Sequence, residues 1–155
     1  MRTPQINEFK AWAQANSDLA KAVLLAQAFA KIERERVDAY ILPMFESRTF
    51  YRAKEWGEQK RITRYDDLYL TDPHGAEYLQ FCADCDAAHR AHGFTGEAGC
   101  CPALIAEDLR CKAESALIDA GCKLMGIDHI YNLEHRAKML KLLLGACLIE
   151  TKEAA

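Results

Sequence analysis

Residues 17–45, SDLAKAVLLAQAFAKIERERVDAYILPMF, constrain the fold most, because apolar side chains recur along them at the spacing of an α-helix. Asn16 or Ser17 can cap this helix at its start, and Pro43 disfavours its continuation. Glu33 interrupts the apolar stripe, so the segment KIERER is expected to project beyond the core. The members of the stripe are Leu19, Val23, Ala26, Ala30, Val37, Ile41 and Met44.

Proline and glycine mark the ends of two further helices. Asp72 and Pro73 are typical of a helix cap followed by the first helical residue, and Gly93 is placed to end that helix. Pro102 is expected to begin the next helix, which we predict to end near Gly121. Its inward face is predicted from an apolar arc of Ile105, Leu109, Ala113, Ala116 and Ala120.

The last helix, roughly residues 128–149, carries apolar side chains at alternating intervals of three and four. This spacing is typical of a seam along which two helices pack. The sequence leaves open whether the seam is internal to the protein or joins two copies in a homodimer through residues 130–147. Its members are Ile130, Leu133, Ala137, Leu140, Leu144 and Cys147.

Residues 45–71 are the least regular part, with no clean helical or strand period, although RITRYDDLYL is compatible with a short strand. Together with a short helix starting at Pro4, the patterns predict an all-α protein. We expect a single domain over residues 1–155, a bundle of about five helices with an irregular 45–71 segment.

Composition narrows the functional classes. The net charge is −3 and neither half of the chain is basic enough to demand a nucleic-acid partner. The N-terminal residues do not resemble a secretion signal. The most apolar run, MLKLLLGACLI, is short and contains Lys141, so no membrane span is expected. We therefore expect a cytoplasmic protein, in which seven cysteines would be core thiols, metal ligands or reactive groups rather than a disulfide framework.

The stretch FCADCDAAHRAHGF is unusually rich in cysteine and histidine. At about 100° per residue, its cysteines and histidines fall with two aromatic residues inside an arc of about 100° on the predicted helix. The opposite side carries small or charged residues, so the inward face is predicted to consist of Tyr78, Phe81, Cys82, Cys85, His89 and His92.

A metal site is one interpretation of this face. A single straight helix cannot bring all four cysteine and histidine ligands to one tetrahedral zinc ion, because Cys82 and His92 would lie roughly 15 Å apart along its axis. A neighbouring pair could bind if the chain after the glycine loop folded back. The candidate zinc ligands are therefore Cys82, Cys85, Cys100, Cys101 and His89, and they would suit a zinc-stabilised nucleic-acid-binding protein.

Two other interpretations of the same face stay open. Cysteine and a neutral histidine can simply fill a core, which the sequence favours, so that no cofactor is required. Cys85 and His89, at positions i and i+4, could instead form a thiol nucleophile and its base. Common enzyme motifs are missing from the sequence, so we expect a non-enzymatic protein without catalytic residues.

Cations and aromatic rings alternate through residues 45–65. Arginine, tryptophan and tyrosine are enriched where proteins bind one another, and the same mixture can hold phosphates and stack on bases. The alternative is a surface segment without a binding role, whose aromatic rings cover the core. We expect contact with another protein, with nucleic acid as the alternative, through Tyr51, Arg52, Trp56, Arg61 and Arg64.

The pieces CDAAHRAHGF and CPALIAEDLRCKAESALIDA resemble a family of small, uncharacterised proteins of proteobacterial genomes and their prophages. The resemblance covers roughly residues 65–120. It implies a phage-linked bacterial cytosol but no activity and no functional residue. The combined expectation is a non-enzymatic protein that binds a macromolecule as a phage-encoded modulator or inhibitor of host machinery, with the anti-CRISPR class as one example.

Overall fold

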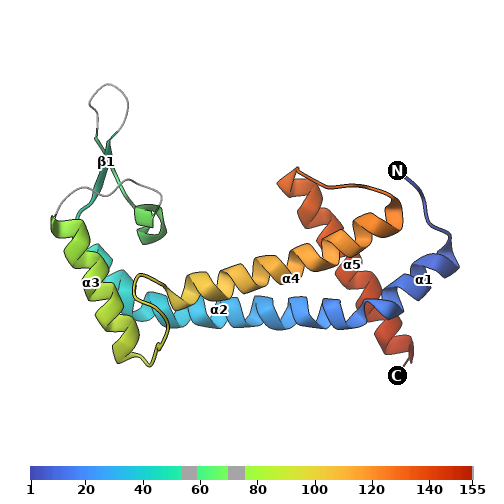
Figure 1. The fold of residues 1–155 in the computed structure, drawn as a ribbon, viewed down its shortest axis with the longest axis horizontal. Helices are drawn as coiled ribbons and strands as arrows, with labels where there is room; N and C mark the ends of the chain where they lie inside the picture. The colour runs from blue at the N-terminus through green and yellow to red at the C-terminus, as the bar shows by residue number, and fades with distance from the viewer. Residues whose placement is uncertain (54–58, 70–75, 155) are drawn as a thin grey trace. The chain divides into compact units, whose positions relative to one another are not determined.

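The computed structural model describes residues 1–53, 59–69 and 76–154, and of residues 52, 53, 59, 69 and 149–154 it describes the backbone alone. The prediction of an all-α fold with about five helices is confirmed: the described residues form five α-helices, one 3₁₀ helix and one small hairpin (Figure 1). The α-helices are α1 (Ile6–Ala15), α2 (Ser17–Glu46), α3 (Ala76–Ala91), α4 (Pro102–Met125) and α5 (Leu133–Ala154), the strands are β1 (Tyr51–Ala53) and β2 (Gln59–Arg61), and the 3₁₀ helix is η2 (Tyr65–Tyr69).

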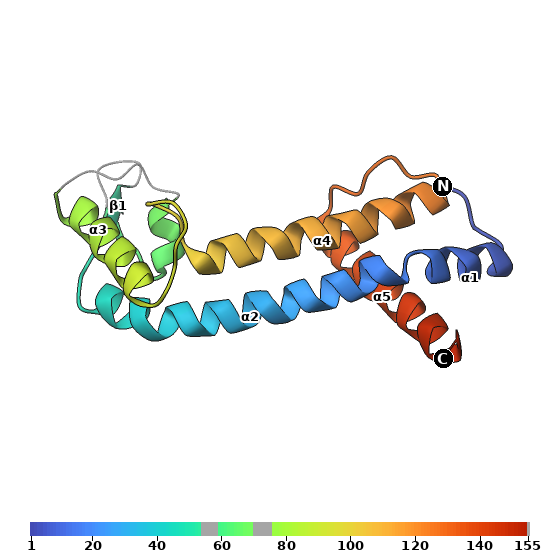
Figure 2. The ribbon, with the colours of Figure 1, turned by 60° about the horizontal axis from the view of Figure 1, so that its bottom comes forward.

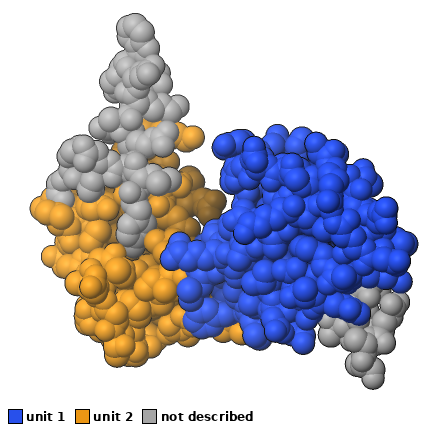
Figure 3. Space-filling view, turned by 45° about the vertical axis from the view of Figure 1, so that its right-hand side comes forward, with its two compact units in different colours: residues 1–31, 106–155 blue, residues 32–105 orange. Residues whose placement is uncertain are grey.

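The chain divides into two compact units, shown in different colours in Figure 3. Unit 1 comprises residues 1–31 and 106–155, and unit 2 comprises residues 32–105. Helices α2 and α4 therefore each contribute residues to both units. The single domain that we expected over the whole chain stays a prediction.

Unit 1 has a core of small and aliphatic side chains from its helices. Trp12 borders this core and donates a hydrogen bond from Nε1 to the carbonyl oxygen of Ala120, at 3.1 Å. Small residues let helices approach closely, and burial of the aliphatic ones supplies most of the favourable free energy. The buried members are Ala13, Ala20, Val23, Leu117, Leu143 and Cys147.

The prediction that helix α4 ends near Gly121 is wrong, because the helix continues to Met125. Gly121 is buried, and a Cβ atom on it would lie 2.6 Å from Cδ1 of Leu143. The glycine is thus explained by the close packing of α4 against α5 and not by a helix end. The helix stops instead before Gly126, whose φ of +64° suits glycine.

The structure corrects two predicted helix faces. On α4, Ile105 and Leu109, which the spacing placed inward, are 42% and 48% exposed, while Leu117 and Ile118 are buried. On α5, the predicted seam is only partly right, because Leu133 is 82% exposed. Farther along α5 the seam holds, since Leu140 and Leu144 border the core and Cys147 lies within it. A homodimer through residues 130–147 stays a prediction.

Unit 2 packs aromatic rings around the C-terminal part of α2, with α3 and the hairpin at that end (Figures 1 and 2). Phe45 stacks on Phe50 at 5.9 Å between ring centroids and also contacts Phe81 and Tyr65. The prediction that Pro43 ends the preceding helix is wrong by about one turn, because α2 runs on to Glu46. Burial of Phe45 in the aromatic cluster offsets the proline's disruption of the helix.

The chain after α2 is irregular, as predicted. Strands β1 and β2 pair antiparallel with Tyr51 opposite Arg61, and Ile62 donates a backbone hydrogen bond to Phe50 at 2.8 Å. The short strand suggested within residues 61–70 is wrong apart from Arg61, because residues 65–69 form η2. The predicted helix start at Asp72 and Pro73 lies outside the described residues.

The end of α3 agrees with the prediction. The helix stops at Ala91, and Gly93 follows with a φ of +90°, a conformation that favours glycine. Throughout the described part of the chain, helices fall short of the length and apolarity that a membrane crossing requires.

Candidate functional site

The cysteine and histidine side chains of α3 face the core of unit 2, as predicted. Phe81, Cys85 and His89 are buried, with 3%, 5% and 2% of their surface exposed. Tyr78 packs partly buried against the same core and Cys82 is half-buried. His92, at the end of the arc, departs from the prediction because it is exposed, and its ring stacks on Tyr40 with centroids 4.1 Å apart.

His89 is held by neighbours that suit a neutral imidazole. Its Nδ1 lies 2.8 Å from the hydroxyl oxygen of Tyr40, and the rings of Tyr40 and Phe94 meet it edge-on. Burial lowers the pKa of His89, because the charged form would lose its hydration. The arrangement gives His89 a structural role in joining α3 to α2.

The buried thiols are poor nucleophiles. Burial raises the pKa of Cys85 to about 12 and also raises the pKa of Cys101, so both stay protonated at neutral pH. His89 shares its Nδ1 with Tyr40. The described contacts therefore do not supply the activated thiolate that a Cys85–His89 nucleophile would need.

The five candidate zinc ligands are only partly brought together. Cys85 and Cys101 belong to the same core, while Cys82 and Cys100 are half-buried. Within the described ranges, no three histidine, cysteine or acidic side chains form a group that could hold a metal ion. Zinc binding by Cys82, Cys85, Cys100, Cys101 and His89 stays a prediction that metal analysis can test.

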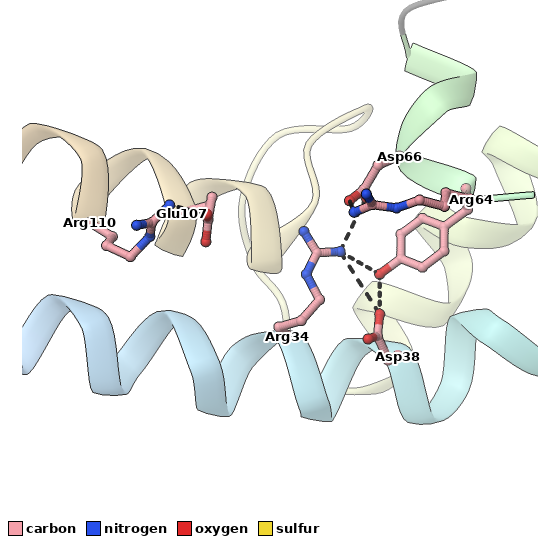
Figure 4. Close-up of polar contacts among 7 residues, drawn as sticks. Arg34, Asp38, Arg64, Asp66, Glu107 and Arg110 are labelled. Carbon is pink, nitrogen blue, oxygen red and sulfur yellow. Dashed lines mark hydrogen bonds and ion pairs between the residues drawn. The ribbon is translucent and has the colours of Figure 1, made fainter. Parts of the chain in front are cut away.

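A polar network that sequence reasoning missed joins η2 to α2 (Figure 4). Arg34 donates hydrogen bonds to the hydroxyl oxygen of Tyr65 at 2.7 Å and to Oδ1 of Asp66 at 3.1 Å. The Tyr65 hydroxyl donates to Asp38, and burial together with this bond raises the pKa of Tyr65. The i, i+4 pair of Arg34 and Asp38 in the broken apolar stripe was the available signal. Its partners on η2 came from too far along the chain to be predicted.

This network is satisfied within itself. Arg64 adds an ion pair to Asp66 at 3.7 Å, and the hollow beside these side chains holds only about 150 Å³. The arrangement therefore fixes the segment that follows β2 rather than offering room for a substrate. Figure 4 also draws Arg110 of α4, which pairs with Glu107 on its own helix.

The predicted partner-binding residues are described in part. Tyr51 is 58% exposed, Arg61 is exposed, and the Arg64 side chain is 74% exposed. Directly opposed residues of an antiparallel pair share a sheet face, so Tyr51 and Arg61 lie side by side. Trp56 and the side chain of Arg52 lie outside the described residues.

A hollow of about 570 Å³ adjoins the start of β1 in unit 2. Arg48 borders it, pairs with Asp84 and lies over the Phe81 ring at 5.2 Å. Hydrogen bonds from Arg48 and Gln80 hold the pKa of Asp84 below its usual range. The lining residues are Arg48, Thr49, Phe50, Ala76, Glu77 and Gln80.

Comparison of the chain with protein-family models, with curated proteins and with solved structures found no match.

Proposed function

We propose that this protein is a non-enzymatic binding protein that contacts another protein through the hairpin of unit 2. We define the hairpin surface as Tyr51, Lys60 and Arg61 together with the hollow at the start of β1. The observation that carries the proposal is the exposed pair of Tyr51 and Arg61, placed opposite each other on β1 and β2.

The chemistry of this pair suits a protein interface. A tyrosine offers a large rigid ring with a polar end, and an arginine offers a planar group with several donors, so both are enriched among residues that dominate binding energy. The adjoining hollow of about 570 Å³ could take one side chain of a partner.

Anchoring of the hairpin supports the proposal further. Phe50 and Ile62 are buried directly beside the two strands, and Arg34 holds the following η2 segment through Tyr65 and Asp66. A surface that is already ordered loses less conformational entropy on binding.

The charge of the surface favours an acidic segment in the partner. Lys60 and Arg61 are exposed and form no ion pair with any side chain that the structure describes. Nucleic acid would be attracted by the same cations, but the net charge of −3 for the whole chain opposes it. A protein is therefore the proposed partner.

The resemblance of residues 65–120 to a proteobacterial and prophage family supports a setting for this binding. Within that setting we favour a phage-encoded modulator of bacterial host machinery, of which anti-CRISPR inhibition is one example. A small protein without a catalytic site can act in this way by covering a surface that its target needs.

Affinity capture from the bacterial host tests the proposal. The full chain, the Tyr51→Ala/Arg61→Ala variant and a Tyr131→Ala/Lys123→Ala control would be immobilised and the bound proteins identified. The control also removes one exposed tyrosine and one exposed cation, but from unit 1. We expect one protein to bind the parent and the control and to be lost from the hairpin variant. Equal capture by all three would contradict the proposal.

The same preparation distinguishes the zinc alternative. Elemental analysis that finds about one equivalent of zinc, with loss of helical circular dichroism on chelation, would favour a zinc-supported nucleic-acid-binding protein instead. Retention of nucleic acid rather than protein would have the same meaning.

A further inference from the structure

We propose that a groove along α5 in unit 1 binds an amphipathic helix of another protein, one whose apolar stripe is flanked by acidic residues. The groove has a volume of about 910 Å³ and is lined by residues of α5 together with Phe9 of α1. Among its lining residues are Phe9, Lys138, Lys141, Leu142, Gly145 and Ala146.

Helix α5 is apolar on two sides, and the core of unit 1 accounts for only one of them. Leu143 and Cys147 face that core, with 2% and 0% of their surface exposed. Leu142, about 100° around the helix from Leu143, is 70% exposed and lines the groove. Apolar side chains around most of a helix are typical of a helix that is covered on more than one side.

The floor of the groove contains a glycine that no described neighbour requires. A Cβ atom on Gly145 would meet no atom of the described residues within 4 Å, whereas a Cβ on Gly121 would collide with Leu143. Glycine inside a helix costs about 1 kcal/mol relative to alanine. An open glycine beside Ala146 and Leu142 allows a second helix to approach at the short end of the usual 8–10 Å axis separation.

The two lysines supply the charge that selects the partner. Lys138 and Lys141 are exposed and line the groove, with Phe9 and Met139 forming its apolar parts. Lys138 has only a surface ion pair with Glu134, and Lys141 pairs with no side chain that the structure describes. Acidic side chains along the partner helix would therefore complement this groove.

A second copy of the chain is a poorer match for the groove. In a contact between two α5 helices, each copy would bring Lys138 and Lys141 to the interface. Glu134 is the acidic residue of this face whose side chain the structure describes, and it already forms an ion pair with Lys138. An acid-flanked helix from a different protein satisfies both the apolar floor and the lysines.

Two synthetic helical peptides of about 18 residues, or ~27 Å, test the proposal with the full chain. Both carry leucine at i, i+4, i+7 and i+11; one has glutamate along both flanks and the other has lysine. Fluorescence anisotropy is expected to show the glutamate peptide binding at least about tenfold more tightly at low salt, with the difference shrinking as salt is added. No binding, or equal affinities, would overturn the proposal.

Variants of the groove keep the test specific. Gly145→Leu fills open space, so we expect at least about a tenfold loss of peptide affinity with no loss of thermal stability. Ala28→Leu, at an exposed position of α2, is the matched control and should bind as the parent does. Lys138→Glu/Lys141→Glu should reverse the preference between the peptides, whereas Lys21→Glu/Lys123→Glu should keep it.

Two further measurements distinguish a second copy from a different protein in the groove, and the groove from the hairpin surface. Sedimentation that reveals a dimer broken by Gly145→Leu would assign the groove to a second copy and overturn the proposal. The Tyr51→Ala/Arg61→Ala variant should bind the glutamate peptide as tightly as the parent, because the hairpin surface belongs to unit 2. Failure of either site is thus distinguishable from failure of the other.

Discussion

Unit 1 packs alanine, valine and leucine side chains between helices, whereas unit 2 packs a cluster of aromatic rings between α2, α3 and the chain around the hairpin. The difference follows from the kind of backbone that each core packs against. Helices present repeating faces that small side chains can match closely, as Gly121 and Leu143 do. Irregular chain presents no repeating face, so large rings such as Phe45 fill the uneven space around it.

Individual polar contacts add to the packing of unit 2. Unit 2 contains the buried His89, bound by Tyr40, and the Tyr65 hydroxyl between Arg34 and Asp38. The Tyr65 contacts fix η2, because backbone outside long helices and strands has fewer hydrogen bonds of its own and side chains hold it in place. The comparison teaches that unit 2 depends on a few individual contacts, whereas the packing of unit 1 is distributed along its helices.

The largest expected effect comes from the centre of the aromatic cluster. Phe45→Ala should lower the free energy of unfolding by about 4 kcal/mol, because it leaves a cavity among Phe50, Tyr65 and Phe81. Chemical denaturation measures the loss. Phe29→Ala, at a phenylalanine that is 46% exposed on α2, is the control and should cost less than about 1.5 kcal/mol. Similar losses in both variants would contradict the role given to the cluster.

A smaller effect is expected in the polar network. Tyr65→Phe removes the hydroxyl that accepts from Arg34 and donates to Asp38, and should cost about 1–3 kcal/mol because both partners are partly buried. Tyr131→Phe, at a tyrosine that is 85% exposed, should change the stability by no more than about 0.5 kcal/mol. A Tyr65→Phe variant as stable as the parent protein would show that ring packing alone holds η2 in place.

Two glycines of unit 1 should respond with opposite signs. Gly121→Ala should destabilise by about 1–2 kcal/mol, because its new Cβ would force Leu143 to move. Gly145→Ala should stabilise by about 0.5–1 kcal/mol, because it meets open space within a helix. Thermal unfolding of the two variants compares them directly. The same sign in both would mean that the packing of α4 against α5 is looser than described.

The smallest expected effect is a pH dependence of the free energy of unfolding that arises from His89 in unit 2. Burial lowers the pKa of His89, so the folded chain binds this proton less readily than the unfolded chain does. The stabilising contribution is complete above the unfolded pKa of about 6.5 and is lost as the pH falls below it. A Gln substitution at His89 should flatten the loss of stability between about pH 7 and pH 5, measured by denaturation at each pH. A loss of stability as steep in the variant as in the parent would contradict the role given to His89.

The sequence predicted features that depend on near neighbours in the chain. The helical stripe of α2, the stop at Gly93 and the inward placement of Cys85 and His89 follow from spacing and local backbone preference. Gly121 misled the prediction because a packing glycine and a helix-ending glycine look alike in sequence.

Features that depend on distant partners could not be predicted. Ile105 was expected inward and is exposed, because the neighbouring helices rather than the apolar arc decide which side of α4 is covered. The Arg34–Tyr65 contact spans 31 positions of the chain. The candidate partner surface was predicted in part from residue types alone, but its hollow beside Arg48 needs α3 to be placed against the start of β1.

The distribution of buried sulfur provides each unit with its own probe of opening. Cys85 and Cys101 are enclosed in unit 2, and Cys122 and Cys147 in unit 1. A thiol reagent can modify them only when the surrounding structure opens. Mass spectrometry of the modified peptides would therefore time the opening of the aromatic and the aliphatic unit in one native sample, without any substitution or added dye.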